Sequence, residues 1–118
     1  MKEVIAIVRP EKWRATQDAI YAVGIADFIH CHVKGRGKQR GLRRSARPLA
    51  TGDGDVSLLP KRMVICFVPD EKTAELVQAI IRVNRTGNYG DGKIFVRPLV
   101  GARSIEIRTG ALAGMAAS

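Results

Sequence analysis

The chain has 118 residues, of which 46% are hydrophobic, and its formal net charge is +9. This length suits one domain with one modest core, and the hydrophobic fraction excludes wholesale disorder. The positive charge favours anionic partners, although charge alone does not choose among them. The two cysteines are too few for a disulfide scaffold, no apolar run is long enough to span a bilayer, and no signal peptide is recognisable. We therefore expect a cytoplasmic, single-domain protein in which both thiols are buried.

The first part of the chain predicts a strand, a helix and a second strand. Residues 4–8 are β-branched and apolar on both faces, which is typical of a central strand. Residues 11–23 then change to a helical period. Residues 28–33 form the next strand, in which His30 and His32 share one face. Two histidines at this spacing are either a metal pair or structural residues, and the lack of further ligands favours the structural role. The helix period rests on Trp13, Thr16, Ile20 and Val23, and the helix is expected to stop at Gly24.

The second part repeats the pattern after a long loop. Residues 62–68 predict a third strand, Asp70 is placed to be the N-cap of a helix that runs to about residue 85, and residues 94–96 predict a fourth strand. Residues 105–108 alternate like a short edge strand, and residues 111–118 are expected to fray. The inner face of the second helix is expected to carry Thr73, Val77, Ile80, Ile81 and Asn84.

The order of these elements predicts an α+β fold of the ferredoxin-like, split βαβ type (βαββαβ) within a single domain spanning 1–118. In this fold both helices cover one face of an antiparallel sheet. The other face then exposes apolar side chains, so we expect the chain to self-associate.

The loop between the second and third strands, residues 34–61, is rich in cations, glycine and proline. Loops of this length are uncommon in compact domains and are usually functional or disordered. A solvated charged loop and an anion-binding arm both remain open at this point. Two glycine-rich segments, 35–39 and 90–93, could cradle a phosphate together with Arg108 if they meet at one end of the sheet, but each is equally consistent with a simple turn. Catalysis is not predicted, because no carboxylate is placed to orient a base.

Several segments, in order along nearly the whole chain, resemble the PII signal-transduction family. They are Ile7-Val8-Arg9-Pro10, the run from Val33 to Gly41, Leu59-Pro60-Lys61, the run from Arg85 to Val96, and Arg108-Thr109-Gly110. The resemblance implies a non-enzymatic homotrimer that binds ATP or ADP between subunits, and 2-oxoglutarate together with Mg and ATP. It also implies a T-loop at about 36–58, a B-loop at about 86–93 and a C-loop at about 101–110.

Site residues follow from the same resemblance. The nucleotide would be held by Ile7, by Gly35, Gly37, Lys38 and Gln39 from one subunit, and by Gly90, Asp91, Gly92 and Lys93 from the other subunit, with Arg108 assisting. Gln39 would ligate Mg, and 2-oxoglutarate would be held by Gln39, Gly41 and Lys61. A target protein would be engaged through Arg40, Arg43, Arg44 and Arg47 of the T-loop. The chain departs from the family's usual pattern at Ile29, Ile65 and Glu106, where the family has a threonine, a glutamate and an arginine, and these changes bear on its preference between ATP and ADP.

The chain looks most like the PII paralogues that regulate nitrogenase, which makes nitrogenase the expected target. Other targets, such as an ammonium transporter, remain open, as does a mixed trimer with a paralogue. The T-loop has no tyrosine, so it has no acceptor for tyrosyl uridylylation. A basic nucleic-acid-binding module is the alternative function, and we do not expect it, because the strands are predicted to lack a pair of exposed aromatic side chains on which bases stack.

Overall fold

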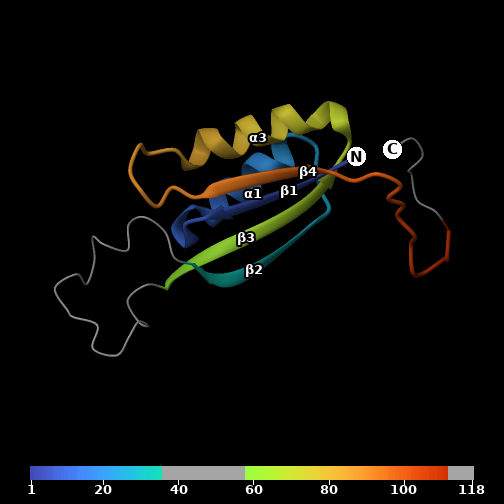
Figure 1. The fold of residues 1–118 in the computed structure, drawn as a ribbon, viewed down its shortest axis with the longest axis horizontal. Helices are drawn as coiled ribbons and strands as arrows, with labels where there is room; N and C mark the ends of the chain where they lie inside the picture. The colour runs from blue at the N-terminus through green and yellow to red at the C-terminus, as the bar shows by residue number, and fades with distance from the viewer. Residues whose placement is uncertain (36–57, 112–118) are drawn as a thin grey trace.

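The computed structural model describes residues 1–35 and 58–111. Within them, four strands form one antiparallel sheet in the order β2-β3-β1-β4 (Figure 1). Because β1 lies between β3 and β4, the chain crosses over twice, which confirms the predicted ferredoxin-like arrangement. The strands are β1 (Lys2–Val8), β2 (Phe28–Gly35), β3 (Leu59–Val68) and β4 (Lys93–Pro98).

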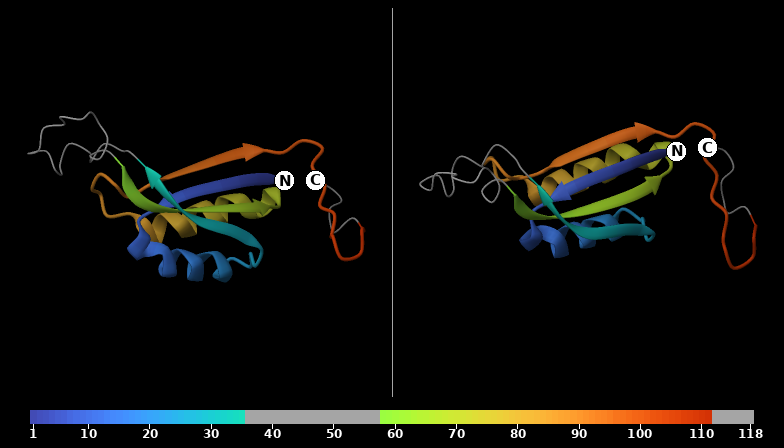
Figure 2. Two further views of the ribbon diagram at one scale, coloured as in Figure 1. Left: turned by 90° about the horizontal axis from the view of Figure 1, so that it is seen from below. Right: turned by 60° about the horizontal axis from the view of Figure 1, so that its bottom comes forward.

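Both helices pack on one face of this sheet (Figure 2). Helix α1 (Trp13–Ala22) follows a short 3-10 turn, η1 (Pro10–Lys12), and α3 (Asp70–Asn84) follows β3 directly. Alternate residues of β1 and β3 face the helices, so they form the core with the apolar stripes of both helices. The core includes Val4, Ala6, Val8, Val64, Cys66 and Val68 from the sheet and Ile20, Leu76 and Ile80 from the helices.

A buried polar contact joins the two helices. The Asn84 side-chain amide donates to Thr16 Oγ1 at 2.9 Å and to the Ile80 carbonyl at 2.9 Å. Both side chains are buried, and these bonds satisfy the Asn84 amide nitrogen, which would otherwise destabilise the core, whereas Asn84 Oδ1 has no hydrogen-bond partner. The prediction that Thr16 and Asn84 face inward is therefore confirmed.

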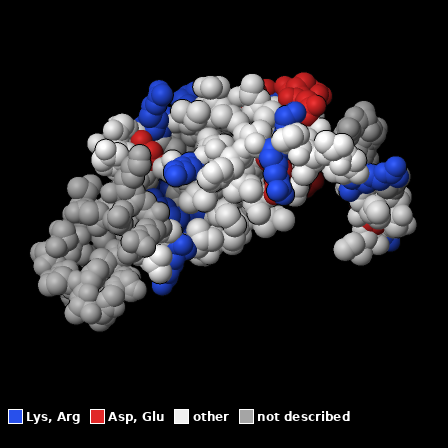
Figure 3. All heavy atoms as spheres, viewed as in Figure 1, with Lys and Arg blue, Asp and Glu red and all other residues white. Residues whose placement is uncertain are grey.

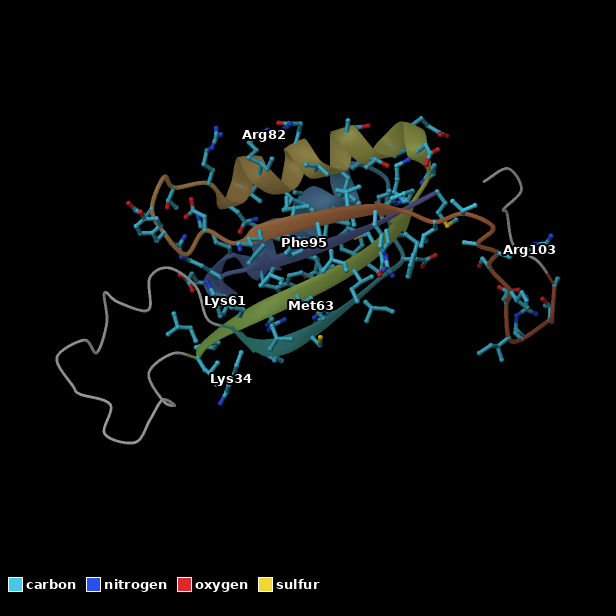
Figure 4. All side chains as sticks on the ribbon, in the orientation of Figure 1. Lys34, Lys61, Met63, Arg82, Phe95 and Arg103 are labelled. Atoms are coloured by element: carbon cyan, nitrogen blue, oxygen red, sulfur yellow. The ribbon has the colours of Figure 1, made fainter. Side chains whose placement is uncertain are left out.

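The opposite face of the sheet is not covered by helices. The strand register aligns Ile29, Ile65, Ile5 and Phe95 in one row across this face. Phe95 is 52% exposed and Phe67 is 49% exposed (Figure 4 shows Phe95). The expectation that the strands lack exposed aromatic residues is thus wrong for the single chain, because these rings point away from the helices. The open face agrees with the expected self-association.

Other local predictions are corrected by the structure. Asp70 does not cap α3, because its carboxylate pairs with the Met1 amine at 2.8 Å and with Lys2 at 3.0 Å. Cys31 is exposed rather than buried, because it lies on an edge strand and faces away from the helices. Only alternate residues of β1 are fully buried, so the strand is not covered on both faces in the single chain.

The remaining corrections concern α3 and the C-terminal segment. The most buried apolar residues of α3 are Leu76, Ala79 and Ile80, so its inner face is rotated from the one predicted. Residues 105–108 form no strand. The Gly110 amide donates to the Glu106 carbonyl at 2.7 Å, and the chain turns there instead of pairing with the sheet. The expected fraying of 111–118 falls almost wholly outside the described residues.

Candidate functional site

The B-loop, residues 86–93, connects the end of α3 to the start of β4. The strand register places Lys93 beside Ile7 and Arg62 beside Val8, so the B-loop lies at the same end of the sheet as Lys61. Gly35 pairs with Leu59 at this end too. Gly35 and the B-loop therefore lie at the same end of the sheet in one subunit, whereas the resemblance implies that they reach the nucleotide from different subunits. Lys34 and Lys61 mark this end in Figure 4.

Asp91 organises the loop through its carboxylate. Its Oδ1 accepts from Arg9 Nη1 at 2.7 Å and from Thr86 Oγ1 at 2.5 Å. Its Oδ2 accepts from the backbone amides of Thr86 at 2.7 Å and of Gly87 at 3.0 Å. The hydrogen bonds from Thr86, followed by those from Arg9 and Gly87, hold the pKa of Asp91 well below its usual range. Asp91 is therefore ionised at neutral pH, and its acceptor positions are already engaged.

Two cations tie the loop carbonyls to the sheet. Arg9 Nη2 donates to the Tyr89 carbonyl at 3.0 Å, and Lys61 Nζ donates to the Gly90 carbonyl at 3.1 Å. In a planar trans peptide the carbonyl and the following amide point in opposite directions. The amides of Gly90 and Asp91 are therefore turned away from these cations. Successive outward amides form a concavity that suits an anion.

Lys61 is partly desolvated in this position. Burial lowers the pKa of Lys61, and the neighbouring Arg9 charge lowers it further. A carboxylate or phosphate beside Lys61 would relieve this repulsion, because an opposite charge favours the ammonium form. The positive charges of Arg9 and Lys61 therefore favour an anion at this end of the sheet.

Gly92 brings the loop into close contact with the central strand. Its φ is +118°, and a Cβ at this position would lie 2.0 Å from the Ile7 carbonyl oxygen. No other residue fits such an approach, since a Cβ contact below 3.0 Å is essentially never found. The backbone itself therefore requires glycine at position 92, so the presence of glycine there is not by itself a sign of contact with a ligand.

An apolar hollow of about 440 Å³ adjoins the B-loop on the helix side of the sheet. The sequence patterns did not indicate it, because its walls come from elements that are far apart in the chain. Its lining includes Val77 and Ile81 of α3, Ile94 and Val96 of β4, and Asp91 and Lys93 at the loop end.

The structure separates Arg108 from this site within one chain. Pro98, the last residue of β4, pairs with Lys2, and the Leu99 amide donates to the Met1 carbonyl at 3.0 Å, so the chain leaves the sheet at the end opposite the B-loop. Figure 1 shows the segment beyond β4 extending away from the sheet at that end. The expectation that Arg108 meets the glycine segments is therefore wrong within a single subunit. Arg108 can join a B-loop only if that loop belongs to another copy.

The described part of the C-terminal segment, residues 99–111, exposes apolar side chains in the single subunit. Val100 is 95% exposed and Ile107 is 96% exposed. Arg108 lies 3.6 Å from the Glu106 carboxylate, which also accepts from the Thr109 hydroxyl at 3.2 Å. Exposed apolar side chains are stabilised when they are removed from water, so this segment is suited to packing against a second molecule.

His30 of β2 packs against the Trp13 ring of α1, and His32 is exposed. The His30 ring lies 4.5 Å from the Trp13 ring, measured between centroids, and His30 Nδ1 is 3.3 Å from Arg62 Nη1. Because a guanidinium can only donate, Nδ1 accepts in this contact. Arg62 also lies over the Trp13 ring at 5.6 Å. This packing supports the structural interpretation of His30.

Charge is distributed unevenly over the described surface. Acidic side chains gather at the start of α3, whose first turn carries Asp70 and Glu71, whereas cationic side chains occur at both ends of the sheet and on the segment beyond β4 (Figure 3). Among the described residues, no three His, Cys, Asp or Glu side chains are grouped to hold a metal, and no described helix is long and apolar enough to cross a membrane. Several predicted residues lie outside the described part: Gly37, Lys38, Gln39, Arg40, Gly41, Arg43, Arg44 and Arg47.

The sequence of the chain matches a family model and several known proteins. Residues 1–111 match the family model described as "Nitrogen regulatory protein P-II". The chain is 42% identical over 116 residues to the "Nitrogen fixation nifHD region GlnB-like protein 2" of Methanothermobacter marburgensis, a match that covers 93% of this chain and 94% of the relative. It is 41% identical over 105 residues to the protein of the same name from Methanococcus maripaludis, covering 84% and 87%. It is also 41% identical over 110 residues to "Nitrogen regulatory protein P-II 1" of Methanothermobacter thermautotrophicus, covering 93% and 91%.

Proposed function

The chain belongs to the nitrogen regulatory protein P-II family, and from this premise we propose that it senses energy and carbon status by binding ATP or ADP and 2-oxoglutarate. As a member of this family it is a signal-transduction regulator and not an enzyme. The observation that carries the ligand proposal is the B-loop, where Arg9 and Lys61 hold the Tyr89 and Gly90 carbonyls, so that the amides of Gly90 and Asp91 are turned away from these two cations. Backbone amides and nearby cations are the groups that bind phosphates.

The proposed nucleotide site is shared between subunits of a homotrimer. One subunit supplies Ile7, Gly35 and the B-loop, and a neighbouring subunit supplies Arg108. The separation of Arg108 from the B-loop within one chain supports this division. The open sheet face and the exposed C-terminal segment supply the apolar surface for such an assembly. Sedimentation should therefore give the mass of a trimer at micromolar concentration, and a stable monomer would contradict the assembly.

The 2-oxoglutarate site is proposed to depend on the nucleotide. Gln39 would ligate the Mg that ATP carries, and Lys61 would neutralise a carboxylate of the keto acid. Isothermal titration should therefore detect 2-oxoglutarate binding in the presence of Mg and ATP, but not with ADP or without a nucleotide. The Gln39→Glu variant should lose this dependence, because a carboxylate then faces a carboxylate. Equal binding with ADP, or undiminished binding by the variant, would remove the assignment.

The T-loop is proposed to bind the target protein. It carries Arg40, Arg43, Arg44 and Arg47, which suit an acidic protein surface because arginine pairs with carboxylates through two parallel hydrogen bonds. The names of the relatives from nitrogen-fixation regions make nitrogenase the first target to test. A variant with Arg43, Arg44 and Arg47 replaced by alanine should keep nucleotide binding and lose the partner in a pull-down from the native lysate. Capture of the same partner with the same response to 2-oxoglutarate would contradict this role, and capture of an ammonium transporter would change the target.

Nucleic-acid binding is a second candidate because Phe67 and Phe95 are half exposed on a basic protein. In the proposed trimer both rings lie on the surface that the other subunits cover, which argues against base stacking. Filter binding of RNA across a salt series separates the two functions. Steep, sequence-independent binding that ATP does not change would favour the nucleic-acid function.

A further inference from the structure

We propose that Arg9, Thr86 and Asp91 are positioning residues that hold the B-loop in its anion-binding shape, and that the Asp91 carboxylate does not itself contact the bound phosphates. The inference rests on the nucleotide binding proposed above. It adds Arg9 and Thr86 to the residues on which that binding depends, and it gives Asp91 a role different from that of Lys93.

The first argument is the set of bonds already made by Asp91. Each carboxylate oxygen accepts two hydrogen bonds, all from Arg9, Thr86 or Gly87, at distances between 2.5 and 3.0 Å. A carboxylate with free acceptor positions beside a phosphate would repel it. Here the Arg9 guanidinium neutralises the Asp91 carboxylate, and the four hydrogen bonds orient the carboxylate toward the loop backbone. The geometry therefore suits an internal brace and does not suit a ligand contact.

The second argument is the position of the Thr86 hydroxyl. It donates to Asp91 Oδ1 at 2.5 Å and accepts from the Asn88 amide at 3.1 Å. One hydroxyl thus links the carboxylate to the backbone two residues further along the loop. Valine has nearly the same shape as threonine but can make neither bond, so this residue offers a clean way to remove the brace.

The third argument is how Arg9 is anchored. Arg9 follows the last residue of β1, the strand that lies between β3 and β4, and its carbonyl accepts from the Lys12 amide at 3.0 Å at the start of η1. Its side chain bonds both the Asp91 carboxylate and the Tyr89 carbonyl. Since one guanidinium holds two points of the loop, the loop is fixed relative to the centre of the sheet. Lysine in its place would keep the charge but could not maintain this two-point geometry.

The test compares ligands that differ in the number of phosphates. We expect Thr86→Val to bind ATP about tenfold more weakly, which corresponds to about 1.4 kcal/mol. Binding of ADP should weaken less, and binding of adenosine should not change, because adenosine has no phosphate for the loop to hold. Arg9→Gln should show the same order of effects, and Arg9→Lys should recover part of the lost ATP affinity. Each variant is compared at equal trimer mass and equal helical signal.

Thr73→Val is the matched control. Its hydroxyl also makes a hydrogen bond, to the Pro69 carbonyl at 3.1 Å, but at the start of α3 and far from the B-loop in the chain. It should bind all three ligands as the wild type does. Equal weakening of adenosine and ATP by Thr86→Val, or no change in ATP binding, would overturn the positioning role. If Thr86→Val does not fold, the two Arg9 variants provide the test. A loss of ATP affinity in Arg9→Gln that Arg9→Lys partly recovers supports the positioning role, and equal ATP affinity in the two variants contradicts it. Failure of the wild-type protein to bind any adenine nucleotide would instead reject the proposed function.

Discussion

Gly92→Ala tests whether close contact between the B-loop and the central strand is a structural requirement. A methyl group at this position would lie 2.0 Å from the Ile7 carbonyl oxygen. Ile7 is paired with β3 on one side and with β4 on the other, so it cannot move aside. The loop itself must move by about an ångström to reach the 3.0 Å limit of real contacts.

Gly87→Ala is the matched control in the same loop. Gly87 also has a positive φ, +90°, but a Cβ there would meet nothing within 4 Å. Both variants therefore pay the cost of a left-handed backbone, about 1–2 kcal/mol. Gly92→Ala alone adds an overpacking cost of about 1–3 kcal/mol. The difference between the two variants isolates the contact with Ile7.

Urea denaturation at one fixed protomer concentration measures both free energies of unfolding, because the stability of an oligomer depends on concentration. We expect Gly92→Ala to be less stable than Gly87→Ala by about 1–3 kcal/mol, and to bind ATP more weakly. Equal stability of the two variants, within about 0.5 kcal/mol, would show that the loop does not approach Ile7 as described.

Three further predictions concern side chains of the same region and the core. Lys61→Met removes the bond to the Gly90 carbonyl and should abolish 2-oxoglutarate binding while leaving ATP binding within about tenfold of the wild type by titration. Burial raises the pKa of the Cys66 thiol to about 11, so the folding stability should fall as the pH rises from about 9 toward 11, and Cys66→Ala should lack this part of the fall in denaturation curves. The lowered pKa of Asp91 stabilises the fold above about pH 4, where the unfolded chain is ionised, and this contribution is lost as the pH decreases further. Asp91→Asn should therefore show a flatter acid limb, and an acid limb identical to that of the wild type would contradict the brace.

The sequence predicted the elements whose period is strong. The helical spacing of Trp13, Thr16 and Ile20 identified α1, and these residues are buried as expected. The predicted inner face of α3 differs from the observed one because Thr73, Val77 and Ile81 fit a helical stripe nearly as well as Leu76 and Ala79 do. The two stripes differ by a small rotation about the helix axis, and tertiary packing buries the one that contains Leu76 and Ala79. Asp70 is a good N-cap by type, but the Met1 amine and Lys2, which are remote in sequence, take its carboxylate.

The candidate site was predicted in part. The glycine pattern indicated a turn at residues 90–93, and the structure shows Lys61 beside it, a neighbour that no sequence pattern predicted. The role of Arg9 was not predicted, since its partners lie about eighty residues further along the chain. The prediction that Arg108 lies at the B-loop end of the sheet is wrong within one chain, because sequence patterns do not show that β4 carries the chain away from the B-loop. A spacing argument cannot distinguish a site within one chain from a site shared by two.

The most direct test of the shared site mixes two defective proteins. Lys93→Ala removes a cation from the B-loop side, and Arg108→Ala removes the cation that a neighbouring subunit is proposed to supply, so each variant alone should bind ATP weakly. In trimers formed by refolding the two variants together in equal amounts, about a quarter of the sites should combine an intact B-loop with an intact Arg108, because a cyclic trimer has head-to-tail interfaces. Titration with ATP should then recover wild-type affinity in about that fraction of sites. No high-affinity sites in the mixture would contradict the account, since it would mean that both residues serve the same subunit or that Arg108 has no part in the site.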